Sequence, residues 1–195
     1  TSTWVPVPLL LCLACVPGGA GERDGLLLEY RFDGNLQDTS GGGHDGTVIG
    51  EAQFGAGREG KALVFDGATY LDSGLMLPEL ETFTAECWVN PGPEQCDWAD
   101  ILGNHAGGGV SGLVIQQRSD ETNAFTFVYG SSSGGYVESA PVPLTAGRWQ
   151  HIALVKDTDE MRGYVNGVLL IVMAAKGPMA ASNASFRVGL GFPFP

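Results

Sequence analysis

The 195-residue sequence predicts an all-β protein, an antiparallel β-sandwich built as one domain. Three observations favour this fold class. From residue 25 onward, apolar and polar residues alternate with a period of two, which is typical of half-buried strands. The 30 glycines and 11 prolines divide the chain into short segments, as frequent turns do. No longer segment carries an apolar stripe of helical period.

The strands are placed by this alternation and by the turns between them. The first strand, 26–32, ends in the Asp-Gly-Asn turn at 33–35. Asp-Gly at 66–67 and Asn-Gly at 166–167 each predict a hairpin between the strands on either side. Along 83–89 the alternation is strict, so every second residue is expected in the core. The predicted strands are 26–32, 47–49, 61–65, 69–71, 83–89, 101–102, 112–117, 125–129, 149–156, 161–165, 168–173 and 186–190.

Composition excludes several classes of protein. Hydrophobic residues make up 44% of the chain and charged residues only 16%, so the chain is not intrinsically disordered. Ten lysines and arginines against 22 acidic residues give a net charge of −12. This charge excludes nucleic acid as a partner and disfavours anionic membrane surfaces. Four cysteines are too few for a fold held together by disulfides.

The N-terminal stretch resembles a leader. Residues 1–20 carry no charge, and the apolar run 9–16 is too short to span a bilayer but fits a signal peptide. Small residues favour cleavage after Ala20, which leaves a domain over 25–195. Two alternatives stay open, a lipidated Cys15 and a buried first strand. Export predicts a secreted or cell-surface protein in an oxidising compartment, without a transmembrane segment.

Four motifs follow one another in a characteristic order. They are LEYRFDGN at 28–35, GKALVFDG at 60–67, FTAECWV at 83–89, and GRWQHIALVK at 147–156 with GYVNG behind it. Together they resemble the laminin G-like, concanavalin A-like lectin/glucanase jelly roll of secreted and cell-surface proteins. The resemblance covers about residues 26–190. It implies two antiparallel sheets.

One departure from that family concerns the last strand. Members usually finish with a Gly-x-Ile/Leu-Asp-Glu-like run that pairs near the first strand, whereas this sequence ends Phe-Pro-Phe-Pro at 192–195. We therefore expect a jelly roll that lacks the closing C-terminal strand, with an exposed sheet edge in its place. The chain is then a fragment of a larger protein, or the strand has been lost.

The chemistry in the sequence favours binding over catalysis. Retaining glycosidases of this fold need two carboxylates on one strand face, and no strand carries a Glu-x-Asp-x-x-Glu run. The acidic cluster 157–160 is predicted to be a solvated turn. We predict a non-catalytic binding or adhesion module that recognises glycans or extracellular proteins. The alternatives are a polysaccharide-acting glycoside hydrolase and a passive structural module of a larger secreted protein.

Three residues are candidates for ligand binding. Trp98 and Tyr136 are aromatic residues in loop-like contexts, and a sugar ring stacks on an exposed aromatic face. Asn104 offers polar contacts from a glycine-rich loop. Packing of Trp98 over a hairpin is the competing interpretation.

A calcium site and a disulfide are the remaining candidates. The resemblance implies a structural Ca²⁺ near the first strand, for which Asp33 and Asn35 offer oxygen ligands, although Asp-Gly-Asn is also good turn chemistry. Because the closing strand is missing, we expect weak binding at best. In an exported chain cleaved after Ala20, Cys87 and Cys96 are the cysteines left to form a bridge, and a buried free Cys87 is equally ordinary.

Overall fold

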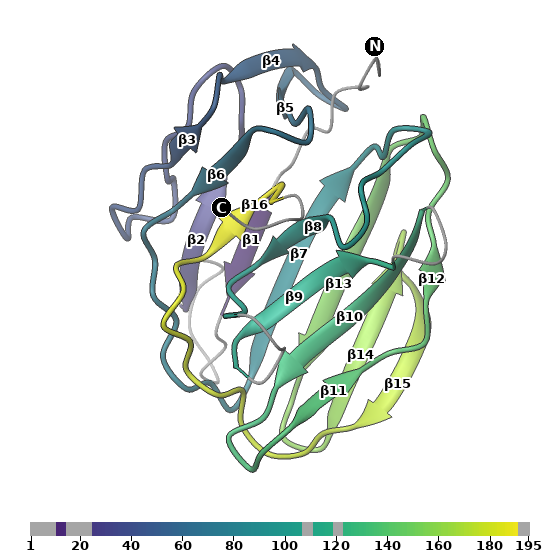
Figure 1. Ribbon diagram of the computed structural model, residues 1–195. Coiled ribbons are helices and arrows are strands. Elements are labelled where there is room, and N and C mark those ends of the chain that lie inside the picture. The colour runs from purple at the N-terminus through teal and green to yellow at the C-terminus, as the bar shows by residue number, and fades with distance from the viewer. Residues whose placement is uncertain (1–10, 15–24, 107–110, 119–122, 191–195) are drawn as a thin grey trace.

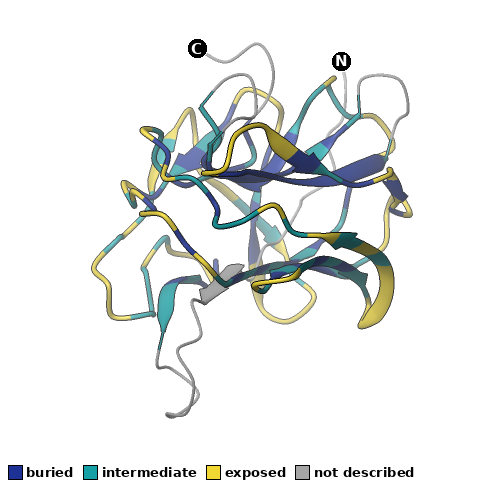
Figure 2. Cartoon of the chain, turned by 90° about the horizontal axis from the view of Figure 1, so that it is seen from below, coloured by how far each residue is buried: buried dark blue, intermediate teal, exposed yellow. Residues whose placement is uncertain are grey.

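The protein is a two-layer β-sandwich. The computed structural model describes residues 11–14 by their backbone, and 25–106, 111–118 and 123–190 in full. Within these residues it contains strands and no helix, so no described helix crosses a membrane. Figure 1 shows the sheets lying over one another, and Figure 2 shows that their buried residues lie between the two layers. The predicted all-β antiparallel sandwich is confirmed.

The first sheet has six strands in the order β15-β14-β13-β7-β1-β2, all antiparallel. Their bounds are β1 Leu11–Ala14, β2 Leu26–Tyr30, β7 Phe83–Val89, β13 Gln150–Lys156, β14 Glu160–Val165 and β15 Val168–Ala174. The predicted hairpin at Asn166-Gly167 joins β14 to β15, with Val165 opposite Val168. Asn166 and Gly167 both have positive φ, as a tight two-residue turn requires.

The second sheet runs β11-β10-β9-β8-β16-β6-β3, and β12 also pairs with β10. Its strands are β3 Thr47–Ile49, β6 Tyr70–Asp72, β8 Asp100–Gly103, β9 Leu113–Gln117, β10 Ala124–Gly130, β11 Tyr136–Glu138, β12 Val142–Pro143 and β16 Arg187–Val188. A separate hairpin consists of β4 Gln53–Ala56 and β5 Lys61–Val64.

The core follows the alternation read from the sequence. On β7 the residues Phe83, Ala85, Cys87 and Val89 are buried, and the residues between them are half-buried on the outer face. Charged side chains also enter the interior, and Lys156 is one of them. Lys156 is 1% exposed, and its ammonium donates hydrogen bonds to the backbone oxygens of Glu81 and Asp157. Burial lowers the pKa of this lysine.

The hairpin predicted at Asp66-Gly67 is wrong. Strand β5 pairs with β4, whereas β6 pairs with β3 and β16, so the two strands beside this turn do not pair with each other. The Asp66 carboxylate accepts hydrogen bonds from the amides of Ala68 and Thr69. The turn therefore leads the chain from the small hairpin into the second sheet. An Asx turn of this kind uses the same residues as a hairpin turn.

Residues 11–14, inside the stretch predicted to be a leader, form β1 between β2 and β7. This pairing agrees with the alternative interpretation that the N-terminal run contains a first strand. Ala20 and Cys15 lie outside the described residues, so leader cleavage and lipidation stay predictions. Strand β2 is the last strand of its sheet, and its outer edge is partly covered because Tyr30 bridges to Asp38.

Candidate functional site

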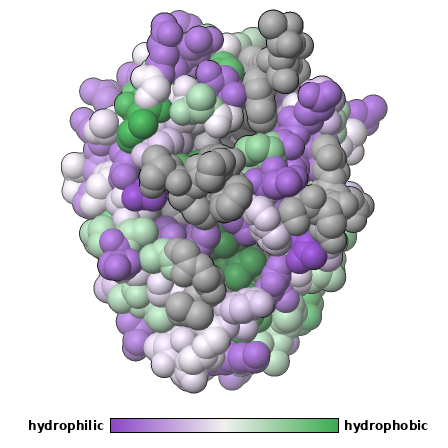
Figure 3. Space-filling view, in the orientation of Figure 1, coloured by the Kyte–Doolittle hydropathy of each residue, from purple (hydrophilic) through white to green (hydrophobic). Residues whose placement is uncertain are grey.

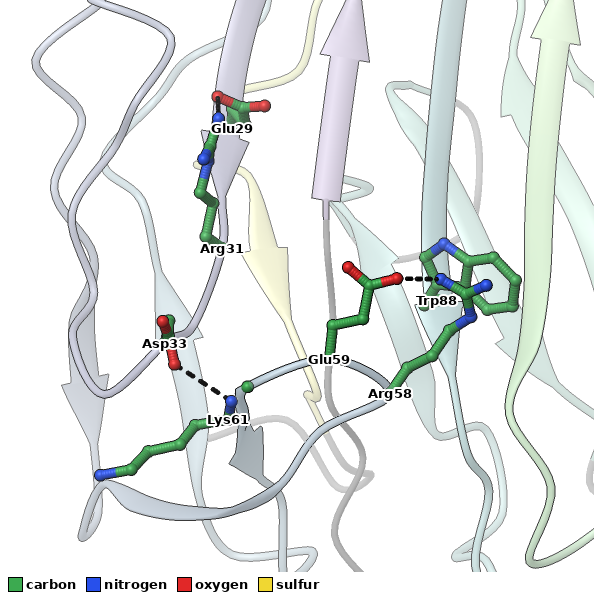
Figure 4. Close-up of a pocket in the computed structure, with 8 residues that line it drawn as sticks. Glu29, Arg31, Asp33, Arg58, Glu59, Lys61 and Trp88 are labelled. Carbon is green, nitrogen blue, oxygen red and sulfur yellow. Dashed lines mark hydrogen bonds and ion pairs between the residues drawn. The ribbon is translucent and has the colours of Figure 1, made fainter.

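A pocket of about 350 Å³ opens on the outer face of the six-stranded sheet (Figure 4). It is lined by Glu29, Arg31, Asp33, Arg58, Glu59, Gly60, Lys61 and Trp88. These residues come from the end of β2, the turn between β4 and β5, and β7. The outer face of the eight-stranded sheet, seen in Figure 3, instead carries interspersed polar and apolar areas.

Strand alternation and one close backbone contact build this pocket. Leu28 and Tyr30 point into the core, so Glu29 lies on the outer face, and Trp88 is placed outward in the same way on β7. The turn after β4 reaches over the sheet because the Asp33 carboxylate accepts a hydrogen bond from the Lys61 amide at 3.1 Å. Gly60 has a φ of +59°, and a Cβ there would lie 2.8 Å from the Asp33 carboxylate oxygen. Only glycine allows this approach without displacement.

Trp88 is the aromatic centre of the pocket. The guanidinium carbon of Arg58 lies 3.9 Å from the centre of its ring, a cation–π contact, and the same guanidinium pairs with Glu59 at 3.0 Å. The ring of His151 is 5.3 Å away and tilted by 54°. His151 Nε2 in turn lies 3.5 Å from a carboxylate oxygen of Glu86. The indole therefore has the His151 ring beside it and is covered by one solvent-exposed arginine.

The charges around Trp88 alternate in sign. Among the residues that the structure describes, three lysines and arginines line the pocket together with three carboxylates. The pocket is thus neutral in a chain whose net charge is −12. The Arg31–Glu29 pair is loose, at 3.9 Å, whereas the exposed Arg58–Glu59 pair is close, at 3.0 Å. Such a site offers both hydrogen-bond donors and acceptors around an apolar ring.

The three ligand-binding residues predicted from the sequence lie elsewhere. Trp98 precedes β8, with the Arg118 guanidinium 5.8 Å from its ring, and Asn104 follows the other end of β8. Asn104 is 2% exposed and its side-chain oxygen accepts a hydrogen bond from the Leu113 amide, which is a structural role. Tyr136 begins β11 and is 48% exposed. None of the three lines the pocket, and their role in binding stays a prediction.

Sequence reasoning missed the pocket because its walls come from three distant segments. Trp88 had a detectable signal, since strict alternation along 83–89 places it opposite the buried residues. Arg58 and Glu59 had no such sequence signal, because nothing local shows that their turn folds over the sheet.

A second cluster that the sequence did not predict lies on the other sheet. There Asp100, 5% exposed, is bonded to His105 at 3.1 Å and to Gln116 at 2.7 Å. Burial raises the pKa of Asp100.

The predicted calcium ligands accept hydrogen bonds from backbone amides. One oxygen of Asp33 accepts from Lys61, and the side-chain oxygen of Asn35 accepts from the Gln37 amide at 3.0 Å. In the described part of the chain, no three His, Cys, Asp or Glu side chains gather into a metal-binding group. Alone, these two residues do not fit the six to eight oxygens that Ca²⁺ takes. Calcium therefore stays a proposal of weak binding.

Melting curves test that proposal. A bound ion raises the melting temperature with the ratio of free ligand to dissociation constant. We expect at most a small rise for the wild type in millimolar calcium relative to chelator, and no rise for Asp33→Ala. An equal rise in both proteins removes Asp33 from the site, and no rise in the wild type removes the site itself.

The structure holds Cys87 and Cys96 as free thiols. Cys87 is fully buried between Ala85 and Val89 on the core face of β7, and burial raises the pKa of its thiol. Cys96 is partly exposed in the loop before β8. This arrangement agrees with the alternative of a buried free cysteine and contains no bridge between the two.

Comparisons with known proteins agree with this architecture. Domain 4 of AbnA, an extracellular GH43 arabinanase from Geobacillus stearothermophilus solved with arabinotriose, is similar at 19% identity with a TM-score of 0.65. The alignment covers 98% of this chain and 87% of that one. The carbohydrate-binding module CBM66 from Bacillus subtilis gives 16% identity, a TM-score of 0.45 and coverage of 74% and 87%. At 19% identity, the similarity to the arabinanase domain shows the fold alone.

Two sequence comparisons bear on the family of the chain. No curated protein sequence matches the chain. Residues 64–191 match the family described as the concanavalin A-like lectin/glucanases superfamily. Because this match spans well over half of the chain, and because the observed sandwich agrees with it, the chain belongs to the concanavalin A-like lectin/glucanases superfamily.

Proposed function

We propose that the chain is a non-catalytic glycan-binding module of a secreted or cell-surface protein, and that the pocket over Trp88 holds the sugar. The observation that carries this proposal is the half-exposed indole surrounded by an equal number of cations and carboxylates. A sugar ring has an apolar face of C–H groups and a rim of hydroxyls that both donate and accept. An aromatic face with mixed polar groups around it is complementary to that pattern.

The neutral balance of the pocket favours a neutral glycan over an acidic one. A sugar carboxylate near Arg31 or Arg58 would also meet Glu29, Asp33 and Glu59. The volume of about 350 Å³ lies at the small end of the range for ligand pockets, which suits one or two sugar units. Superfamily membership supports the proposal, and the arabinotriose complex of the similar arabinanase domain suggests arabino-oligosaccharides as first probes.

One observation keeps the hydrolase alternative in view. Glu29 on β2 and Glu86 on β7 both lie opposite Cys12 of β1, so two carboxylates stand level on one face, two strand spacings apart. That places their backbones about 10 Å apart. Inverting glycosidases hold their carboxyl groups roughly 6.5–9.5 Å apart. Both carboxylates already have partners. Glu29 accepts a hydrogen bond from the Thr39 hydroxyl, and Glu86 lies beside the His151 ring.

Titration calorimetry with neutral oligosaccharides, with product analysis on the same samples, tests the proposal. We expect saturable binding of at least one neutral oligosaccharide and no release of shorter sugars. Release that disappears in both Glu29→Gln and Glu86→Gln would establish the hydrolase instead. Absence of binding across neutral and acidic glycans would leave the passive structural module.

A further inference from the structure

Strand β1 occupies a slot that fits one strand. Each of its four residues pairs with β2 on one side and with β7 on the other. Leu11 lies opposite Tyr30 and Cys87, and Leu13 lies opposite Leu28 and Ala85. The positions level with Leu11 and Leu13 are therefore the ones where both neighbouring strands turn fully buried side chains inward.

The two walls of the slot do not pair with each other. Neighbouring strands lie about 4.8 Å apart, so β2 and β7, with one strand between them, are separated by roughly twice that distance. Without an occupant, both strands would present unpaired backbone N–H and C=O groups beside exposed core residues. The slot thus requires a strand. Because the hydrogen bonds are made by the backbone, a strand from this chain or from another peptide can form them.

The connection to the occupant is the feature that makes exchange possible. Residues 15–24 join β1 to β2, and the predicted cleavage after Ala20 falls within this connection. A cut there would leave β1 attached to the sandwich through its backbone pairing with β2 and β7. Strands added to a sheet in this way bind through main-chain hydrogen bonds, with selectivity from alternate side chains.

We propose that the channel between β2 and β7 is a strand-accepting site. Its ligand is an extended peptide with aliphatic residues at two alternate positions and no acidic residue between them. The aliphatic positions follow from the buried neighbours of Leu11 and Leu13. Exclusion of acidic residues follows from Glu29 and Glu86, which flank the position of Cys12 on both sides.

The same strand spans the floor between the two walls of the pocket. Glu29 and Arg31 come from β2 and its end, whereas Trp88 comes from β7, and β1 runs between these strands (Figure 4). The occupant of the slot therefore sets the distance between the pocket walls. Peptide binding is measured without any glycan, so its outcome is independent of the proposed function.

The test uses the full chain with a protease recognition sequence placed within 15–24 and cut after folding, under reducing conditions. We expect the N-terminal fragment to co-elute with the body in native buffer and to separate in denaturant. A labelled peptide of residues 9–16 should then exchange into the slot. The matched control peptide carries Leu11→Asp and Leu13→Asp, and we expect it to bind at least tenfold more weakly.

Hydrogen exchange at the amides of β2 and β7 decides the remaining outcomes. A fragment that separates in native buffer while these amides stay protected would overturn the proposal, and so would equal binding of both peptides. A body that unfolds as the fragment leaves supports the proposal if the peptide of residues 9–16 restores protection and the control does not. Failure of both peptides to restore it overturns the proposal.

Discussion

Replacing Trp88 with alanine is expected to weaken glycan binding roughly fivefold to thirtyfold while leaving the sandwich folded. Among the described residues the indole is the one aromatic side chain that lines the pocket, and removing its face removes the surface on which a sugar ring stacks. Loss of one stacking contact costs about 1–2 kcal/mol, which corresponds to roughly a fivefold to thirtyfold loss of affinity. Because Trp88 lies on the outer face of β7, its truncation opens no cavity in the core.

Trp98→Ala is the matched control for this variant. Trp98 is also half-buried, and it too has an arginine near its ring, yet it lies outside the pocket. Calorimetry on both variants, with melting curves to check folding, separates the two sites. We expect full affinity in Trp98→Ala. The reverse result, with affinity lost there and kept in Trp88→Ala, would place the ligand at the loop residue predicted from the sequence.

The fold was predictable because alternation and turn chemistry are local properties. The buried set on β7 follows directly from the period of two along 83–89, and the β14–β15 hairpin follows from Asn166-Gly167. The prediction was wrong where one local signal fits two kinds of turn, as Asp66-Gly67 does. The aspartate of Asp66-Gly67 binds amides two and three residues ahead, which ends β5 without pairing it to β6.

The candidate site was not predictable in the same way. Its walls are segments from residue 29 to residue 88 that meet through sheet order, through the contact between Asp33 and Lys61, and through Arg58 over Trp88. None of these contacts is encoded in a local pattern. The N-terminal run shows the same difficulty, because a short uncharged apolar segment is compatible with both a signal peptide and a β-strand. The sequence predicts aromatic residues in loops as ligand contacts, whereas the pocket contains an aromatic residue on a strand face.

Replacing Gly189 with alanine should produce a large loss of stability. Gly189 follows β16 with a φ of +73°, and a Cβ at this position would lie 2.2 Å from a ring carbon of Phe65, which is 7% exposed. Two penalties combine at this site. A left-handed conformation costs a non-glycine residue about 1–2 kcal/mol. Overpacking against a buried ring adds about 1–3 kcal/mol.

Gly147 separates these two penalties. Its φ of +71° is nearly the same, its amide also donates a backbone hydrogen bond, and a Cβ there would meet no atom within 4 Å. Gly147→Ala should therefore show the conformational cost alone, about 1–2 kcal/mol. Urea unfolding of both variants measures the difference in the free energy of unfolding, which we assign to the collision with Phe65.

A double-mutant cycle tests this assignment. Adding Phe65→Leu, which shortens the side chain, should lower the free energy of unfolding less in Gly189→Ala than in the wild type, because the smaller residue relieves the collision. Equal losses in the two glycine variants would show that the loop after β16 moves aside at no cost.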